Sequence, residues 1–397
     1  MFFLVLERPH LINLKISNIE AKNLKNMLIN FSRDSDNFII QWLRSLDKII
    51  LTLLIFWITL GLIFATTTTL EFVSIKLYND PKTLIRKFYL FIGISFLIIL
   101  FFSVFNESFY QEFAKIFFVF SFFLLFLTLI IGIEVKGSKR WINLFLFNLQ
   151  PVELLKPSLI LFLAGIFSSE KKFITKFLLS GTTVLSAVLI LLLQPDYTQS
   201  LIVILVWFTI VFLSGISLIN IILIFSIVIG MMTSVLFFFK ANFSYIFSRF
   251  EIWLSSNNIS YQSEKSLDAI KHGGFFGQGI GEGILKEKIP EAHTDYVLAS
   301  ICEEYGIVAI ILILIIIFSL FMRVFAICQN EISNFKKYTL IGLSTLILLQ
   351  IFINVGVTIN LLPSTGMTFS FLSYGGSSIL TSAFIMGIIL ALTKNRL

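Results

Sequence analysis

The residue best suited to chemistry in this sequence is an aspartate at the start of a long apolar run. Asp295 closes the string PEAHTD and is followed at once by Tyr296-Val297-Leu298. A carboxylate at such a polar–apolar boundary is partly desolvated, which raises a carboxyl pKa towards the range that suits a general base. An aspartate there commonly caps the N-terminus of a helix instead. The residues alone leave both roles open.

A glycine-rich segment precedes this aspartate. Between Tyr261 and Asp295 the sequence places six glycines in eleven positions, from Gly273 and Gly274 to Gly283. Their spacing fits neither a dinucleotide-binding nor a P-loop motif. Such glycines let a backbone approach a ligand closely and adopt positive φ, although a flexible surface loop is the alternative. Glu291 and His293, within PEAHTD, are expected to shape the loop.

The string GSKRWINLFLFNLQPVELLKP at 137–157 gathers charged and aromatic residues before another apolar run. Arginine binds phosphate through a planar fork and lysine acts as a point charge. Binding of an anionic group and simple anchoring of a helix end among lipid headgroups are both open. An acid and a base three positions apart on one helix face can also neutralise each other. The candidate residues here are Arg140, Trp141, Gln150, Glu153 and Lys156.

Three smaller signals accompany these strings. Asp196 in QPD lies at the end of an apolar run, and FLSYGGSS offers Ser373, Tyr374, Gly375 and Gly376 before the last run. Glu303 and Glu304 lie within an apolar run, where an acid must find a partner or hold its proton. Each of these features is also compatible with a purely structural role.

The composition indicates whether this chain folds in water or in a membrane. Of 397 residues, 57% are hydrophobic and 13% are charged, against roughly 25% charged in soluble domains. These values exclude a soluble enzyme and a disordered chain. Two cysteines and three histidines provide neither a disulfide framework nor a zinc motif. Basic residues flanking membrane spans account for the net charge of +7 better than nucleic-acid binding does.

We therefore predict an all-α polytopic membrane protein with about ten spans. The fourth run is short and contains Lys156 and Pro157, which predicts an interrupted span facing protein or a water-filled cavity. Lys and Arg in the loops favour cytoplasmic N- and C-termini. The runs lie at about 49–69, 88–105, 116–133, 154–168, 177–193, 199–217, 219–239, 296–322, 339–362 and 376–393.

Two parts of the chain fall outside this pattern. Residues 1–47 are polar and are predicted to form a cytoplasmic tail, and 48–397 to form the membrane domain. The long segment 240–295, between the seventh and eighth spans, is predicted to be an extracytoplasmic loop. Long connections commonly carry function.

Taken together, these strings resemble the SEDS family of bacterial cell-wall proteins (FtsW, RodA and SpoVE). The resemblance covers about residues 50–393 and rests on the order and spacing of GSKRWI with QPVELLK, QPD, QSEKSLDAI–GGFFGQGIG, PEAHTD and LSYGGSS. Through the third string it adds Gln262 and Ser266 to the candidate substrate-binding residues. The chain departs from the family pattern at Asn148, where a basic residue is common, and at Tyr197-Thr198, where Leu-Gly is usual.

This resemblance implies a glycosyltransferase that polymerises lipid II into peptidoglycan strands at the outer face of the cytoplasmic membrane. Ala292 is more typical of the division members (FtsW) than of the elongation members (RodA), which implies work at the septum with a class B penicillin-binding protein and other divisome proteins. An elongation polymerase similar to RodA is the alternative. The family's essential aspartate matches Asp295. A Mg²⁺ or Mn²⁺ ion is a possible requirement, no organic cofactor is expected, and membrane lipids surround the protein.

Two rivals belong to other functional classes. Ten spans with charges inside helices also suit a transporter that moves lipid II across the membrane. The second rival is a scaffold that recruits a penicillin-binding protein without catalysing a reaction. The long loop with its own carboxylate favours an enzyme, because a transporter needs no cluster of polar residues confined to one side of the membrane.

Overall fold

The computed structural model describes residues 38–68, 82–135, 138–144, 148–216 and 260–394, with isolated positions at 80 and between 219 and 253. Residues 47–393 form one compact unit. A short helix, α2 (Phe38–Ser45), precedes it within the segment predicted as a polar tail. The rest of that tail and most of the predicted 219–239 span lie outside the described residues, as does most of 240–259.

Nine of the ten predicted runs are helices among the described residues. Seven of these helices are long and apolar enough to cross a membrane, and α9 and α15 are shorter apolar helices. The fold is therefore the predicted all-α membrane protein. The bounds are α3 (Lys48–Thr68), α5 (Thr83–Val104), α6 (Glu107–Ile131), α7 (Pro151–Ser168), α8 (Phe173–Leu193), α9 (Tyr197–Leu213), α13 (Val297–Gln329), α14 (Asn334–Thr358) and α15 (Gly376–Leu392).

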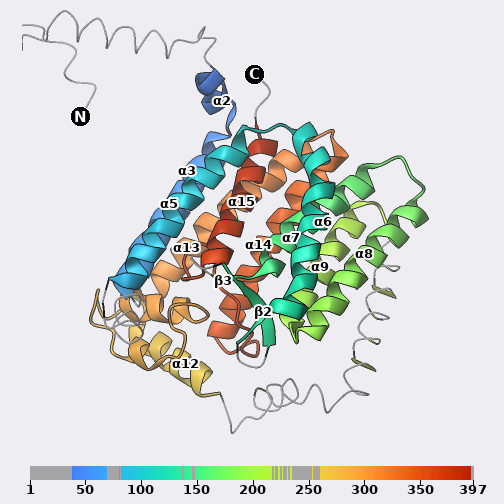
Figure 1. The fold of residues 1–397 in the computed structure, drawn as a ribbon. Helices are drawn as coiled ribbons and strands as arrows, with labels where there is room; N and C mark the ends of the chain where they lie inside the picture. Colours follow the sequence, from blue (N-terminus) through green and yellow to red (C-terminus); the bar gives the residue numbers. More distant parts are fainter. Residues whose placement is uncertain are drawn as a thin grey trace, which may run out of the picture. The chain divides into compact units, whose positions relative to one another are not determined.

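The helices divide into a protein-buried centre and a lipid-facing periphery (Figure 1). Within the apolar windows, 72% of α7 and 67% of α14 are buried, against 28% of α6 and of α13. Helix α15 is buried along nearly its whole length, packing on α5, α7 and α14. Since an apolar helix needs no water-facing stripe in a membrane, most exposed side chains of the peripheral helices are apolar, apart from charged ones near the helix ends, such as Lys87 on α5 and Glu112 on α6.

Helix α7 is continuous, contrary to the predicted interruption. It begins at Pro151, three residues before the predicted run, and passes through Pro157. Proline suits the first turn because its missing N–H would have no partner there. The expectation that this span faces protein is confirmed, since most of its residues are buried, including nearly all of its first two turns.

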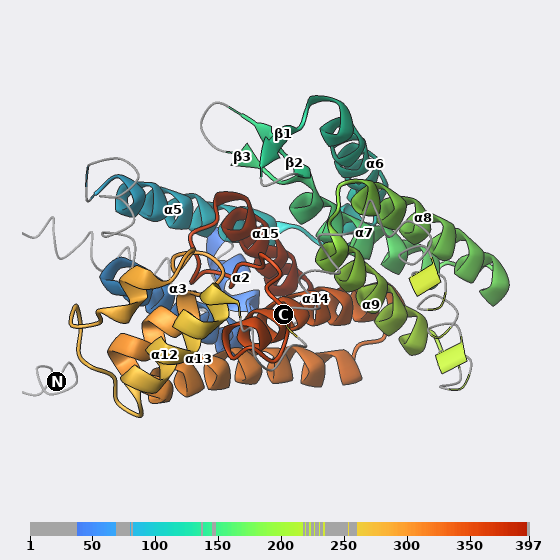
Figure 2. The same cartoon turned by 90° about the horizontal axis from the view of Figure 1, so that it is seen from below.

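A small antiparallel sheet precedes α7, which the all-α prediction did not include. Strands β1 (Ile133–Val135), β2 (Ser138–Asn143) and β3 (Asn148–Leu149) pair in the order β1-β2-β3. Figure 2 shows this sheet beside α6 and α7, at the end of the bundle from which the picture is viewed. Hairpin pairing satisfies the backbone of this loop and fixes the direction of the basic side chains on β2.

The long loop ends in α12 (Tyr261–Gly273) and a 3₁₀ turn, η1 (Leu285–Lys288), which lie against α13. Helix α13 is kinked at Gly306, where φ is 78° and ψ is 175°. At the kink the carbonyls of Glu303 and Glu304 accept from the amides of Gln278 and Gly279, at 2.9 and 3.1 Å.

The loop also accepts the amides that the kink frees. Ile307 and Val308 donate to the carbonyls of Gly274 and Phe275, at 3.0 and 3.3 Å. Segment 274–279, which we call the wedge, therefore completes the backbone hydrogen bonding of α13. An added Cβ on Gly306 would lie 2.1 Å from the carbonyl oxygen of Phe275, so only glycine fits there.

Candidate functional site

Asp295 lies in a turn (residues 291–296) immediately before α13, and its side chain is partly exposed. The N-cap position of α13 is occupied by Tyr296, so Asp295 is not the capping residue of that helix. Glu291 has φ of 61°, and its carbonyl accepts from the amides of Thr294 and Tyr296 at 3.0 and 3.4 Å. We call residues 291–296 the Asp295 turn.

The loop between α14 and α15 (residues 359–375, the C-terminal loop) packs on the Asp295 turn. The amide of Tyr374 donates to the carbonyl of His293 at 2.8 Å, and their rings lie 6.2 Å apart. Gly366, with φ of +76°, faces the carboxylate, because an added Cβ would lie 3.8 Å from Oδ2 of Asp295. The two predicted motifs, PEAHTD and LSYGGSS, therefore meet in space.

Ser373 links the two loops a second time. Its Oγ donates to the carbonyl of Thr294 at 2.5 Å and accepts from the amide of Phe369 at 2.8 Å. Its hydroxyl is buried, and both donor and acceptor functions are used. Sequence analysis identified Ser373 as a substrate-binding candidate, and the structure places its hydroxyl in contact with the protein backbone.

Asn354, near the end of α14, makes the third link and was missed by sequence analysis. Its Nδ2 donates to the carbonyls of Asp295 and Met367 at 2.9 and 2.6 Å. A signal was available, because Asn354 is an amide within an apolar run and polar side chains inside spans are rare and commonly functional.

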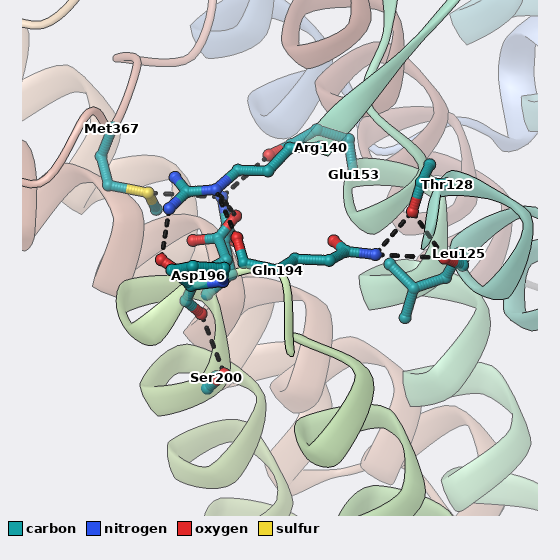
Figure 3. Close-up of polar contacts among 10 residues, drawn as sticks. Leu125, Thr128, Arg140, Glu153, Gln194, Asp196, Ser200 and Met367 are labelled. Carbon is teal, nitrogen blue, oxygen red and sulfur yellow. Dashed lines mark hydrogen bonds and ion pairs between the residues drawn. The ribbon is translucent and has the colours of Figure 1, made fainter. Parts of the chain in front are cut away.

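Arg140 on β2 points into the turn between α8 and α9 (Figure 3). Its Nε donates to the carbonyl of Gln194 at 3.1 Å, its Nη2 donates to the carbonyl of Pro195, and Nε lies 3.6 Å from Oδ2 of Asp196. The side chain keeps 24% exposure. Arg140 therefore both fixes this turn and presents a cation at the surface.

Asp196 is almost fully buried beneath Arg140. Burial raises the pKa of Asp196, and the positive charges of Arg140 and Lys156 only partly offset that effect. Its backbone carbonyl accepts from the hydroxyl of Ser200 at 2.9 Å in the first turn of α9. Beside it, Gln194 anchors the turn by donating to Oγ1 of Thr128 at 2.5 Å.

Glu153 and Lys156 form a buried ion pair within α7. Lys156 Nζ lies 2.8 Å from Oε1 of Glu153, and the lysine side chain is 1% exposed. The prediction that these residues neutralise each other is confirmed. Gln199 on α9 also donates to Oε1 of Glu153, at 3.3 Å. We call Arg140, Glu153, Lys156, Asp196 and Gln199 the charge cluster.

Met367 connects the charge cluster to the Asp295 turn. Its Sδ accepts from Nε2 of Gln199 at 3.4 Å, while its carbonyl accepts from Asn354. A continuous series of polar contacts therefore runs from Glu153 through Gln199, Met367 and Asn354 to the backbone of Asp295. Residues of α7, α9, α14, the Asp295 turn and the C-terminal loop therefore meet at one end of the bundle.

The other candidates of the 137–157 string lie at the edge of this site. Trp141 pairs with Ile133 in the sheet and is partly exposed. Gln150 holds the N-cap position of α7 without a side-chain capping bond, and its carbonyl accepts from the amide of Glu153 at 3.0 Å.

The candidates on α12 contact other helices. Ser266 is buried and donates to the carbonyl of Thr358 at 2.8 Å, while Gln262 is partly exposed. An added Cβ on Gly273 would lie 2.0 Å from the carbonyl oxygen of Cys302, whereas Gly274 has open space and φ of +56°. The close approach predicted for Gly273 is thus made to α13.

Glu303 and Glu304 find the partners that sequence analysis required. Glu303 accepts from the amides of Leu285 and Lys286 at 2.8 and 2.6 Å and lies 3.0 Å from Nδ1 of His272. Glu304 pairs with the ammonium of Lys286. Both acids hold η1 and α12 against α13.

The last glycine pair serves helix packing at Gly376, where an added Cβ would lie 2.6 Å from the ring of Phe91 on α5. Gly375 occupies the N-cap position of α15. Across the described part of the chain, no three His, Cys, Asp or Glu side chains come together as a metal site.

Comparisons with known proteins bear on this fold. At 34% identity, the chain is similar to a probable peptidoglycan glycosyltransferase FtsW of Wigglesworthia glossinidia brevipalpis, covering 84% of this chain and 90% of the relative. It is 30% identical to stage V sporulation protein E of Bacillus subtilis, over 87% and 96% of the two chains.

Solved structures share the architecture. A chain of a peptidoglycan synthase complex that coordinates polymerization and crosslinking superposes with a TM-score of 0.72 at 24% identity, covering 88% of this chain and 98% of that chain. Rod shape determining protein RodA of Thermus thermophilus gives 0.65 at 23% identity, covering 88% and 97%. The family of cell cycle proteins that comprises FtsW, RodA and SpoVE matches residues 47–397. The chain belongs to that family.

Proposed function

We propose that this protein is a peptidoglycan glycosyltransferase that polymerises lipid II, with Asp295 as its general base. The observation that carries the proposal is the setting of Asp295. Its side chain is partly exposed, while hydrogen bonds from Tyr374, Ser373 and Asn354 hold three successive carbonyls of its turn. A base that is held through its main chain and has a partly exposed side chain suits proton transfer.

The proposed reaction begins with a proton transfer to Asp295. Asp295 accepts the proton of an acceptor sugar hydroxyl, and the hydroxyl oxygen attacks the anomeric carbon of a donor. The bond from that carbon to the diphosphate oxygen breaks, and polyprenyl diphosphate leaves with the bonding electrons. Attack opposite the leaving group inverts the anomeric centre.

Arg140 is the better of the two proposed cations for the departing diphosphate. It is partly exposed, whereas the charge of Lys156 is buried and balanced by Glu153. We therefore assign Lys156 to holding the charge cluster and Arg140 to stabilising negative charge at its surface. A bound Mg²⁺ or Mn²⁺ would add the same electrostatic help, and no step here depends on it.

The cellular setting is part of the proposal. The similarity to proteins named FtsW supports septal cell-wall synthesis, with the Asp295 end of the bundle facing outwards and both termini cytoplasmic. The likeness to a chain from a synthase complex that coordinates polymerization and crosslinking supports a class B penicillin-binding protein as partner. Other divisome proteins complete the proposed assembly.

The decisive experiment compares lipid II polymerisation by wild-type and Asp295→Asn protein, each purified with its penicillin-binding partner. Loss of a general base lowers the rate by at least about 100-fold. Asp268→Asn is the matched control, because it removes a partly exposed acid of α12 whose ion pair among the described residues is with Lys265. Wild-type polymerisation by Asp295→Asn refutes the proposal.

The same preparations separate the rival functions. Flipping of fluorescent lipid II in proteoliposomes is scored beside polymerisation. A transporter flips the lipid without polymerising it, and a scaffold does neither while still binding the partner.

A further inference from the structure

Asn354 is a buried amide in the apolar part of a spanning helix. It is 1% exposed, and the neighbouring buried positions of α14 are mostly aliphatic. Leaving such an amide without partners costs roughly 1–3 kcal/mol, so an aliphatic side chain is the default for this environment. The identity of this residue therefore needs a specific explanation.

The explanation lies in the two carbonyls that its Nδ2 reaches. One belongs to Asp295 and the other to Met367 of the C-terminal loop, at 2.9 and 2.6 Å. The two protons of one amide nitrogen thus bind two segments that are 72 positions apart in sequence. A leucine of similar size would leave both carbonyls without this donor.

We propose that Asn354 is a positioning residue for Asp295. It touches the main chain of Asp295 and acts on the carboxylate through it. This inference rests on the proposed function of Asp295 and adds a residue to it. The hydrogen bond from α14 to the carbonyl of Asp295 restrains the main chain that carries the carboxylate.

The second contact extends the effect to the charge cluster. Because Met367 also accepts from Gln199, Asn354 holds the Asp295 turn at a fixed place relative to α9 and Glu153. Donor and acceptor must both be aligned with the base, and a displacement of about 1 Å costs on the order of 100-fold in rate. Asn354 therefore affects turnover more than substrate binding.

The test measures kcat and KM for lipid II polymerisation by Asn354→Leu protein with its penicillin-binding partner. We expect kcat to fall by about 10- to 100-fold with KM changed by less than about threefold, since geometry is lost and binding groups remain. Hydrogen exchange should rise in peptides covering 291–297 and stay unchanged in those covering the middle of α14. Asn354→Ala gives the same split if leucine prevents folding.

Ser344→Ala is the matched control. It removes a buried hydroxyl of the same helix that has no hydrogen-bond partner among the described residues, and it should leave kcat and exchange unchanged. Wild-type kcat in Asn354→Leu, a rise in KM that accounts for the whole loss, or unaltered exchange at 291–297 would each overturn the inference. Failure of the proposed function is recognised separately, by wild-type activity in Asp295→Asn.

Discussion

Asp47 uses its two carboxylate oxygens for two different tasks, one of them an ion pair with Arg323. Oδ1 accepts from the amides of Ile49 and Ile50, both at 3.0 Å, and so caps α3. Oδ2 accepts from Nε and Nη2 of Arg323 on α13, at 3.1 and 2.7 Å. The residue thereby fixes the start of one spanning helix to the far end of another.

Replacing Asp47 should separate these tasks. Asp47→Ala removes the cap and the ion pair and should lower the free energy of unfolding by about 1–2 kcal/mol. Asp47→Asn retains a capping oxygen and should cost less. Thermal melting in detergent measures both, and equal losses in the two variants would contradict the division.

The same pair predicts a dependence of stability on pH. Burial opposes ionisation, but the hydrogen bonds from Arg323 and the backbone outweigh it and hold the pKa of Asp47 below its usual value of 3.8. A depressed pKa contributes stability that is present above pH 3.8 and is lost as the pH falls through the folded value. The difference in melting temperature between wild type and Asp47→Asn should therefore be constant near neutrality and shrink below about pH 4.

Asp196 predicts the opposite sign. Its pKa is raised in the folded protein, so the folded state binds the proton more tightly than the unfolded chain and stability falls as the pH rises above 3.8. Asp196→Asn mimics the protonated form and should be at least as stable as wild type at pH 7. That advantage should vanish as the pH approaches 4, and a variant that is less stable at every pH would refute the argument.

The buried pair of α7 predicts non-additive stability effects. Lys156→Met leaves Glu153 charged and buried, which should cost about 3–5 kcal/mol. Adding Glu153→Gln removes the uncompensated charge and keeps an acceptor for Gln199, so the double variant should recover most of the loss. Melting of the four proteins of this cycle gives the coupling, and additive losses would disprove it.

Two glycines make a matched pair for the packing of α12. Gly273→Ala should detach α12 from α13, because the new Cβ would lie 2.0 Å from the carbonyl of Cys302. Gly93 on α5 has nothing within 4 Å of an added Cβ, so Gly93→Ala should be neutral or stabilising by up to about 1 kcal/mol. Hydrogen exchange across 261–273 reports the difference, and equal protection in both variants would contradict it.

Much of this fold is predictable because apolar length alone defines a spanning helix. The nine described helices of the predicted runs, seven of them long enough to cross a membrane, and the pairing of Glu153 with Lys156 followed from composition and helical spacing. The sheet at 133–149 was not foreseen, since its strands are short and one of them has only two residues. The continuity of α7 through Pro157 was missed because the cost of a proline depends on surroundings that a sequence does not display.

The residues of the site could be predicted where their side chains carry the chemistry. They could not be predicted where main-chain atoms make the contacts. Asp295, Arg140 and Asp196 were recognised from charge in an apolar chain. Met367 contributes a main-chain carbonyl, which every residue carries, and a thioether sulfur, which is only a weak acceptor and does not mark a site. The crowded glycines were expected to receive a ligand, but the space beside Gly273 and Gly277 is filled by the backbone of α13.

The wedge at 274–279 has a consequence for biogenesis. Without it, the carbonyls of Glu303 and Glu304 and the amides of Ile307 and Val308 would lack the partners that the kink denies them, and any of these groups that entered the hydrocarbon region would find no water in exchange. The wedge is translated before α13, so its chain is already available when that helix enters the bilayer. Helix and loop are therefore expected to mature as one insertion unit, and the loop is part of how α13 becomes a stable transmembrane segment.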